Sequence, residues 1–308
     1  MLFSNKKVRI QSIMSSQFFL ENHVLDILRE DELHMMVSGN KYRKLKYNCH
    51  EALRTENKCL LTFGGAHSNH IAATAAAAKE MGLTSVGVIR GEELVDKISE
   101  NPTLSYAKAC GMQLHFVTRD AYRQKDSQLF LNELIQHFGD CYILPEGGSN
   151  ALAVKGCAEM HEQIPLDYTY ICTPVGTGGT LAGLVEGSSE NQMILGFSAL
   201  KGTFQASEVQ KFTSKMNYTL LDEYCFGGYA KIDATLVRFI NEFKTRTGIL
   251  LDPVYTGKMI FGILELIKKG YFPENSRILA VHTGGLQGIQ GMNKRLKKKN
   301  LPQIDTTL

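Results

Sequence analysis

The chain has 308 residues, of which 44% are hydrophobic and 21% charged, and its formal net charge is +3. This composition suits one large or two medium globular domains and lacks the strongly basic character of nucleic-acid-binding proteins. No uncharged apolar run approaches the length of about 18 residues that a membrane span needs, and the first residues lack the apolar core of a signal peptide.

The seven cysteines are scattered, their number is odd, and no Cys-x-x-Cys pair occurs. Most of them lie in apolar runs, which indicates reduced core thiols and disfavours a disulfide framework or a zinc site. We therefore expect a cytoplasmic protein that binds neither membranes nor nucleic acids.

Short apolar runs alternate with helical patterns along the sequence. Strands are expected at 24–28, 59–63, 85–89, 113–118, 141–144, 169–173, 193–198, 218–222 and 277–282. Helices are expected at 42–53, 71–81, 103–110, 126–138, 151–163, 205–216, 234–246 and 257–269, with a last helix after 285. This alternation predicts an α/β protein with mainly parallel sheets.

Four polar turns that contain glycine follow apolar strands, at 64–70, 145–150, 174–180 and 283–285. The turn at 145–150 breaks the pattern and is expected to return the chain to a second lobe. Ligands of parallel α/β sheets bind beyond the carboxyl ends of the strands. If the two lobes face each other, the four turns can therefore line one cleft.

The turn at 174–180 lies between an apolar strand and a helix start. Its backbone N–H groups would point to one place at the positive end of the helix dipole, which suits a phosphate, and Thr177 and Thr180 could add hydroxyl donors. No Lys-Ser/Thr pair follows the glycines, and the next glycine is Gly183, so the Walker A and dinucleotide motifs are both excluded. A tight turn without a ligand is the alternative.

Lys41 follows Gly39 and Asn40 in a turn before a helix. A lysine that is partly desolvated at a cleft has a lowered pKa and can form a Schiff base, whereas the alternative is an ordinary surface lysine. An aldehyde that carries a phosphate would connect Lys41 with the 174–180 turn. Pyridoxal phosphate needs such a lysine, a phosphate cradle and a partner for its ring nitrogen.

Four motifs resemble, in the same order, those of the pyridoxal-phosphate enzymes grouped as D-cysteine desulfhydrase and 1-aminocyclopropane-1-carboxylate deaminase. They are Gly39-Asn40-Lys41-x-Arg43-Lys44-Leu45, Gly64-Gly65-x-x-Ser68-Asn69, Asp252-Pro253-Val254-Tyr255-x-Gly257-Lys258 and His282-x-Gly284-Gly285. The resemblance covers about 30–290 and implies the tryptophan-synthase-β-like fold, also called fold type II. It implies a larger cofactor-binding lobe (1–44 and 150–308), a smaller lobe (45–149) and a homodimer acting on a small amino acid.

The resemblance also implies which residues hold the cofactor. Lys41 would carry it and shuttle the substrate α-proton, and Asn69 would bond the ring hydroxyl. The phosphate would be cradled by Gly176, Thr177, Gly178, Gly179 and Thr180.

Three further residues would face the substrate. Ser68 would contact its carboxylate, or serve as nucleophile or proton carrier, although its position also suits a helix N-cap. Tyr255 would stand over the reacting carbon, and Tyr229 is a looser match to a second active-site tyrosine. Either tyrosine could instead be a buried aromatic residue with a satisfied hydroxyl. The histidines show no metal-ligand spacing and are expected to be structural.

Two positions distinguish the activities within this family. The cyclopropane deaminases resemble one another in carrying Glu and Leu where this chain has Thr256 and Thr283. A carboxylate beside the ring nitrogen favours the protonated ring and so a strong electron sink, whereas a hydroxyl does so less. Ring opening needs the stronger sink, and loss of a thiolate needs less help.

We therefore expect β-elimination, with D-cysteine converted to pyruvate, hydrogen sulfide and ammonia. The alternative in the same class is deamination of 1-aminocyclopropane-1-carboxylate to 2-oxobutanoate. Alternatives in other classes are a ligand-binding protein that has kept the fold without turnover, and a nucleotide-dependent transferase that uses the 174–180 turn.

Overall fold

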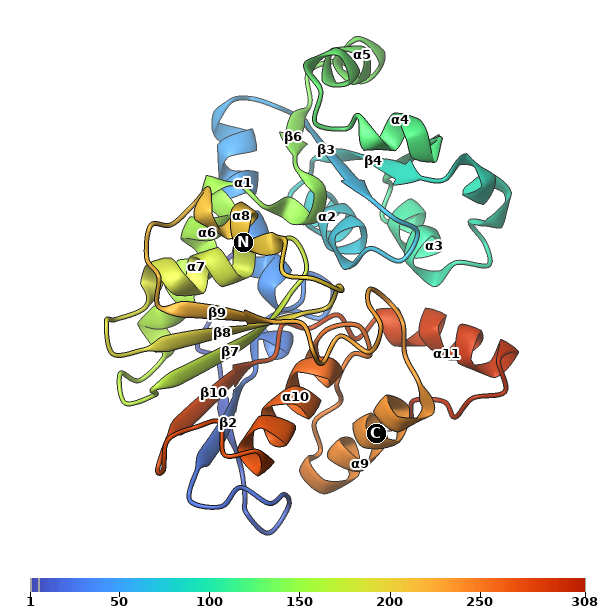
Figure 1. The fold of residues 1–308 in the computed structure, drawn as a ribbon. Helices are drawn as coiled ribbons and strands as arrows, with labels where there is room; N and C mark the ends of the chain where they lie inside the picture. Colours follow the sequence, from blue (N-terminus) through green and yellow to red (C-terminus); the bar gives the residue numbers. More distant parts are fainter. Residues whose placement is uncertain (1, 5, 308) are drawn as a thin grey trace.

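The computed structural model describes residues 2–4 and 6–307, and these residues form two β-sheets covered by helices (Figure 1). One sheet has the strand order β1-β2-β10-β7-β8-β9 and the other has the order β5-β4-β3-β6. The strands are β1 (Ile10–Ile13), β2 (Val24–Leu28), β3 (Cys59–Gly64), β4 (Thr84–Arg90), β5 (Gln113–Val117), β6 (Tyr142–Leu144), β7 (Tyr170–Val175), β8 (Met193–Ser198), β9 (Tyr218–Leu221) and β10 (Arg277–Val281). Every pairing except that of β1 with β2 is parallel, which confirms the predicted class.

The helices connect these strands in the expected alternation. They are α1 (Asn40–Arg54), α2 (Asn69–Glu80), α3 (Pro102–Ala109), α4 (Arg119–Arg123), α5 (Gln128–Phe138), α6 (Ala151–Ala158), α7 (Gly179–Gly187), α8 (Gln205–Gln210), α9 (Ala234–Thr247), α10 (Thr256–Lys268) and α11 (Gly288–Lys298). Four short 3₁₀ turns join them, at Glu30–Glu32, Glu92–Lys97, Glu146–Gly148 and Glu159–Gln163.

Two elements, β1 and α4, were not predicted, and two expected helices end earlier than predicted. Strand β1 was not predicted, because it is a four-residue strand at the sheet edge. The helix expected at 205–216 ends at Gln210, and the Thr213 hydroxyl accepts a hydrogen bond from the Lys215 N–H, a local bond that competes with the helix. The helix expected at 151–163 ends at Ala158 and continues as a 3₁₀ turn.

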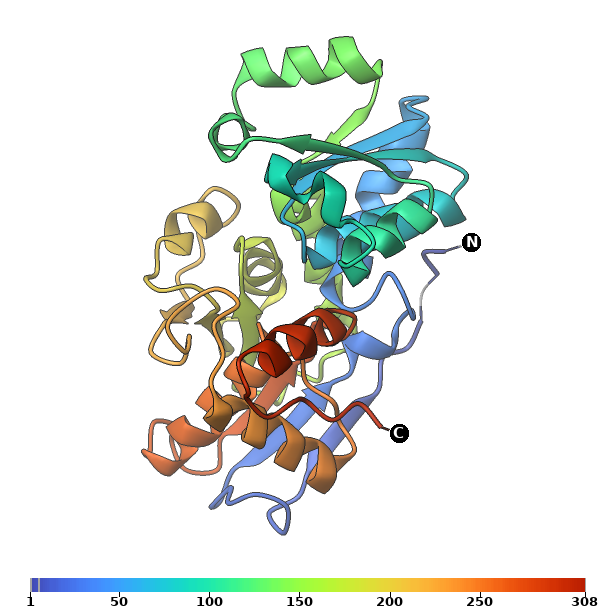
Figure 2. The same ribbon diagram turned by 90° about the vertical axis from the view of Figure 1, so that its right-hand side faces the viewer.

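The large sheet carries helices on both faces. Neighbouring residues of β7 point to opposite sides, so Ile171 packs in the core under α6 and α7 while Cys172 packs against α9 and α10. Figures 1 and 2 show the small sheet with α2–α5 as a separate lobe beside it. We call these two parts the large lobe and the small lobe. The predicted boundary between residues 44 and 45 falls inside α1, a continuous helix, so the chain has no flexible linker there.

Glycine allows three helices of the large lobe to approach one another closely. A Cβ at Gly156 of α6 would lie 2.1 Å from the carbonyl oxygen of Arg43 in α1. A Cβ at Gly183 of α7 would lie 2.4 Å from the Cβ of Cys157. Neither position has room for a side chain, so α1 packs on α6, and α6 packs on α7, at backbone distance. This packing sets the distance between the start of α1 and the start of α7.

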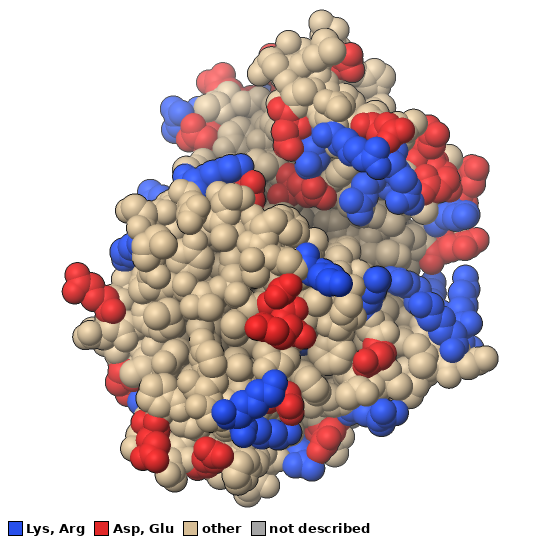
Figure 3. Space-filling model, viewed as in Figure 1, with Lys and Arg blue, Asp and Glu red and all other residues tan. Residues whose placement is uncertain are grey.

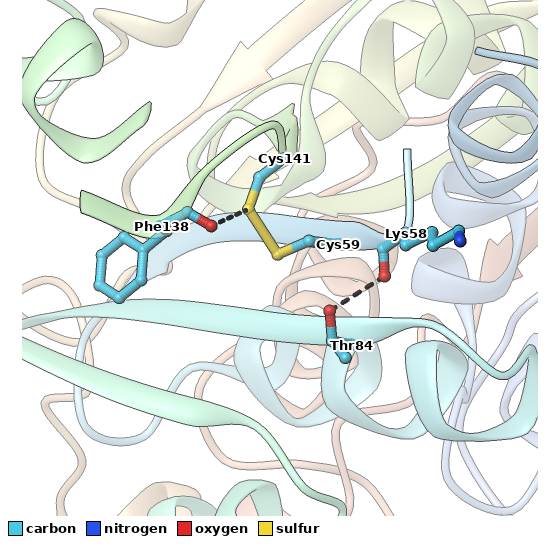
Figure 4. Close-up of a disulfide and its surroundings, with 5 residues drawn as sticks. All are labelled: Lys58, Cys59, Thr84, Phe138 and Cys141. Carbon is cyan, nitrogen blue, oxygen red and sulfur yellow. Dashed lines mark hydrogen bonds between the residues drawn. A yellow bond between two sulfur atoms is a disulfide. The ribbon is translucent and has the colours of Figure 1, made fainter. Parts of the chain in front are cut away.

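Cys59 and Cys141 form a disulfide, so the expectation that all cysteines are reduced was wrong for this pair (Figure 4). The strands β3 and β6 are parallel neighbours, with Leu60 opposite Tyr142, and the two cysteines precede this pair with Cα atoms 4.6 Å apart. They are 82 residues apart in sequence, so the pairing depends on a strand order that composition does not reveal. The remaining cysteines are free.

Among residues 2–4 and 6–307, none of the helices combines the length and apolar character needed to cross a bilayer.

Replacing Cys141 by Ser should lower the free energy of unfolding by about 2–4 kcal/mol, because the unfolded chain loses a cross-link that closes a long loop. Urea denaturation measures this change, and Cys110→Ser, which removes a free and partly exposed thiol, is the matched control. The unreduced wild-type protein should show five reactive thiols when denatured, and reduction should expose two more. Titration of all seven thiols without a reductant would contradict the disulfide.

Candidate active site

Lys41 lies in the first turn of α1, and its position is fixed by the glycine before the helix. Gly39 has φ +61°, and a Cβ there would lie 2.0 Å from the carbonyl oxygen of Thr283. Only glycine fits this contact, because it tolerates positive φ and leaves room for the neighbouring backbone. The start of α1 is thereby held against the motif at 282–285.

A chain of hydrogen bonds connects Lys41 with the glycine-rich turn. Lys41 Nζ donates to Asn40 Oδ1 at 3.1 Å, and Asn40 Nδ2 donates to Thr180 Oγ1 at 2.8 Å. Burial, together with the charge of Lys44, lowers the pKa of Lys41 to about 7. A large fraction of this amine is therefore neutral at pH 7, which makes it a nucleophile and a base.

The glycine-rich turn has the geometry of an anion site. It follows β7, Gly178 adopts φ +85°, and α7 begins at Gly179 without a side-chain cap on its first N–H groups. Lys44 Nζ lies 3.1 Å from the position of a Cβ on Gly179, and burial lowers the pKa of Lys44 to about 8. Backbone donors, a helix N-terminus and a lysine amine thus meet at one point.

Lys44 also joins the two turns at 145–150 and 174–180. Its Nζ donates to the carbonyl oxygen of Gly147 and to Ser149 Oγ, each at 2.9 Å. Ser149 Oγ lies 2.6 Å from Thr177 Oγ1. No site role was predicted for Lys44 or Ser149, although Lys44 stands three residues after Lys41 and so shares its helix face. That spacing was the available signal.

The structure places the two predicted tyrosines together beside the same turn. A Cβ at Gly176 would lie 3.3 Å from the ring of Tyr255, and the rings of Tyr255 and Tyr229 meet edge to face with centroids 6.3 Å apart. Burial raises the pKa of both hydroxyls, so both remain protonated and can donate hydrogen bonds. Tyr229 is 46% exposed.

Ser68 and Asn69 lie at the start of α2 and contact different partners. Ser68 is the N-cap, and its Oγ accepts the N–H of Ile71 at 3.3 Å, so the capping role is observed. Asn69 Oδ1 accepts from Gln287 Nε2 at 2.9 Å, and Asn69 Nδ2 lies 2.6 Å from the position of a Cβ on Gly285. Asn69 therefore joins the small lobe to the 282–285 motif of the large lobe.

Asp252 shapes the loop that carries Tyr255. Its carboxylate accepts the N–H groups of Val254, Tyr255 and Thr256 at 2.7–3.0 Å. The Thr256 hydroxyl is fully buried and donates to Asp252 Oδ1 at 2.8 Å. Thr283 is also buried, with its carbonyl against Gly39.

Two of the histidines, His282 and His70, form hydrogen bonds within their own lobes. His282 Nε2 lies 2.8 Å from the carbonyl oxygen of Leu250, and its Nδ1 accepts the N–H of Gly284. His70 Nε2 lies 2.9 Å from Thr62 Oγ1. The described part of the chain contains no group of three potential metal ligands. The structural role expected for the histidines stays a prediction.

A buried ion pair anchors the helix that carries both lysines. Arg43 Nε and Nη2 donate to the two carboxylate oxygens of Glu30 at 2.9 and 2.8 Å, and the exposed fractions of the two residues are 6% and 0%. Bidentate geometry of this kind fixes orientation as well as distance. The pair therefore sets the rotation of α1 about its axis.

Comparison with known proteins agrees with this geometry. A family model described as pyridoxal-phosphate-dependent enzyme matches residues 12–284. The chain is 33% identical over 290 residues to a Pyrococcus abyssi protein whose name marks it as a candidate 1-aminocyclopropane-1-carboxylate deaminase, with coverage of 85% of this chain and 84% of that protein. It is 31% identical over 291 residues to the D-cysteine desulfhydrase of Klebsiella pneumoniae strain 342, with coverage of 85% and 87%.

A solved structure shows the same fold. The crystal structure of a homologue of 1-aminocyclopropane-1-carboxylate (ACC) deaminase superposes with a TM-score of 0.84 at 29% identity. The superposition covers 97% of this chain and 95% of that one. The residues described above fit the cofactor that the family model names. Lys41 offers a neutral amine to an aldehyde, and the glycine-rich turn with Lys44 offers an anion site to a phosphate.

Replacing Arg43 by Met should lower the free energy of unfolding by about 3–5 kcal/mol, because the Glu30 carboxylate would remain buried without a partner. Urea denaturation followed by circular dichroism measures this. Arg54→Met is the matched control, since Arg54 lies on the same helix in an exposed pair with Glu51. The double variant E30Q/R43M should regain most of the loss. Equal losses in Arg43→Met and Arg54→Met would show that the buried pair has no special role.

Proposed function

The chain belongs to the family of pyridoxal-phosphate-dependent enzymes, and on this basis we propose that it catalyses β-elimination on a small amino acid, first of all D-cysteine. The products are pyruvate, hydrogen sulfide and ammonia. Bound pyridoxal phosphate supplies the electron sink for the pair of electrons left at the substrate Cα.

The observation that carries the choice of substrate is the buried hydroxyl of Thr256. By family resemblance this position would lie beside the ring nitrogen of the bound cofactor, where the cyclopropane deaminases have Glu. In this chain the hydroxyl is neutral and donates to Asp252. A neutral group favours the protonated ring less than a carboxylate does, and thiolate loss tolerates the weaker electron sink.

The side chains supply proton transfer and orientation. The neutral Lys41 amine takes the proton from the substrate Cα, and the resulting ammonium stays beside Asn40 Oδ1. Tyr255, whose hydroxyl remains protonated, donates a hydrogen bond to the departing sulfur. Ser68 faces the substrate carboxylate from the start of α2. Water then completes the release of pyruvate and ammonia.

Deamination of 1-aminocyclopropane-1-carboxylate is the second candidate, because relatives with that name and with the name D-cysteine desulfhydrase match this chain at similar identity. A binding protein without turnover is a weaker candidate. It would not need a lysine whose pKa is lowered to about 7 beside a second lysine and a phosphate-type turn.

We further propose a homodimer, on the family resemblance. A cytoplasmic location is also a proposal, although the Cys59–Cys141 disulfide removes two cysteines from the reduced-thiol argument that favoured it.

Replacing Lys41 by Ala should reduce D-cysteine turnover by about 10²–10⁴-fold, because the variant lacks both the amine that holds the cofactor and the base. Sulfide and pyruvate release measure this, and Lys79→Ala, an exposed lysine on α2, is the control. Capture of pyridoxal phosphate by the cofactor-free protein should accelerate as pH rises through about 7, since only the neutral amine attacks the aldehyde. Full turnover in Lys41→Ala would refute the mechanism.

The double substitution T256E/T283L should shift the ratio of kcat/KM values toward 1-aminocyclopropane-1-carboxylate by about tenfold. A carboxylate at position 256 would favour the protonated ring and strengthen the electron sink. Steady-state assays of both substrates measure the ratio. Thr256→Ser keeps the hydroxyl and should leave the ratio unchanged, and Thr283→Leu alone measures the effect of the second substitution without the Glu. An unchanged ratio in folded, cofactor-loaded variants would contradict the proposed role of position 256.

A further inference from the structure

A pocket of about 250 Å³ opens at one edge of the small sheet. It is lined by Arg90, Arg119, Tyr122, Arg123, Lys125 and Glu146. Arg90 ends β4, α4 follows β5, and Glu146 follows β6. These strands belong to one parallel sheet, so their carboxyl ends share an edge, which is where α/β sheets bind ligands.

The lining of this pocket has an excess of positive charge. Four cationic side chains face one carboxylate. Figure 3 shows cations gathered on the small lobe above the hollow that separates it from the large lobe. Three of them already form ion pairs: Arg119 with Glu93 at 2.6 Å, Arg123 with Asp120 at 2.5 Å, and Lys125 with Glu146 at 3.6 Å. The pairs of Arg119 and Arg123 are exposed, and exposed pairs contribute little to stability.

Arg90 is the cation without an anionic partner. Its side chain is exposed and forms no ion pair or hydrogen bond with another residue among residues 2–4 and 6–307. Its guanidinium carbon lies 5.6 Å from the ring centroid of Tyr122, and Lys125 Nζ lies 5.7 Å from the same centroid. The Tyr122 ring therefore holds Arg90 and Lys125 beside the pocket through cation–π contacts. The guanidinium N–H groups of Arg90 remain available to a ligand.

The pocket adjoins the proposed active site. Arg90 Nη2 lies 3.5 Å from the position of a Cβ on Gly65, in the turn that leads to Ser68. On its other side, Glu146 precedes Gly147, whose carbonyl oxygen accepts from Lys44. An anion in the pocket would thus lie next to the residues that are proposed to face the substrate.

We propose that this pocket binds a small oxyanion group, a carboxylate, sulfonate or phosphate, through the bidentate donors of Arg90. The oxyanion arrives either as a free ion or as the distal group on the leaving thiol of an S-substituted cysteine. Only the second source rests on the proposed function. In that case the Cα–H and Cβ–S bonds break, the sulfur leaves with its electron pair as an anionic thiolate, and water hydrolyses the remaining fragment to pyruvate and ammonia.

The first test measures binding without turnover. Inorganic phosphate is titrated into the cofactor-loaded protein by calorimetry, in the wild type and in Arg90→Gln. Arg238→Gln is the matched control, because Arg238 is an exposed arginine on α9. Loss of one bidentate charged contact should weaken binding about tenfold in Arg90→Gln. Unchanged affinity in Arg90→Gln would overturn the assignment of Arg90, and no binding to the wild type counts against a free ion.

The second test identifies the source of the oxyanion. Turnover of S-carboxymethyl-D-cysteine is compared with that of its neutral isostere, S-carbamoylmethyl-D-cysteine. A preference for the carboxylate that falls about tenfold in Arg90→Gln, with D-cysteine turnover unchanged, supports a substrate-borne group. Arg90-dependent phosphate binding without that preference supports a free ion. If neither Arg90-dependent phosphate binding nor the preference for the carboxylate substrate is found, the proposal is overturned. If the protein binds phosphate but catalyses no elimination, only the proposed function is refuted.

Discussion

The buried ion pair between Glu30 and Arg43 is the interaction on which the site depends. Removing two charges from water is expensive, and the bidentate contact compensates for this only in one orientation. Arg43 stands between Lys41 and Lys44 on α1, so the orientation that the pair selects also aims both lysines. The Glu30 carbonyl accepts the N–H of Gly39 at 3.1 Å and holds the approach to the helix as well. Glu30 thereby fixes the orientation of the helix that carries Lys41 and Lys44.

Close backbone contacts at two glycines also fix the position of α1. Gly39 rests on Thr283, and Gly156 rests on the carbonyl of Arg43. Both contacts leave no space for a Cβ, so the large lobe brings segments from opposite ends of the sequence to backbone distance. The motifs at 39–45 and 282–285 are therefore two sides of one contact. This explains why both motifs contain glycine although no glycine performs chemistry.

The sequence predicted the elements whose patterns are local. Strands β2 and β8 were predicted at their observed bounds, and the class of fold was confirmed. Local patterns could not reveal partners that only the folded chain brings together. The roles of Lys44 and Ser149 depend on turns more than 100 residues from α1, and the Cys59–Cys141 bond depends on strand order. The β1 strand was missed because it is short and gains its partners only from β2.

The network around Lys44 joins three separate segments of the chain, at α1, 147–149 and 177–179. Burial lowers the pKa of Lys44 to about 8. Keeping this amine out of water costs free energy, and a bound phosphate would offset part of that cost. A ligand that binds only the folded chain stabilises it in proportion to the logarithm of its concentration over its dissociation constant. Pyridoxal phosphate is thus a folding ligand as well as a reagent for this chain. Removing the cofactor should therefore lower the stability of the folded chain as well as its activity.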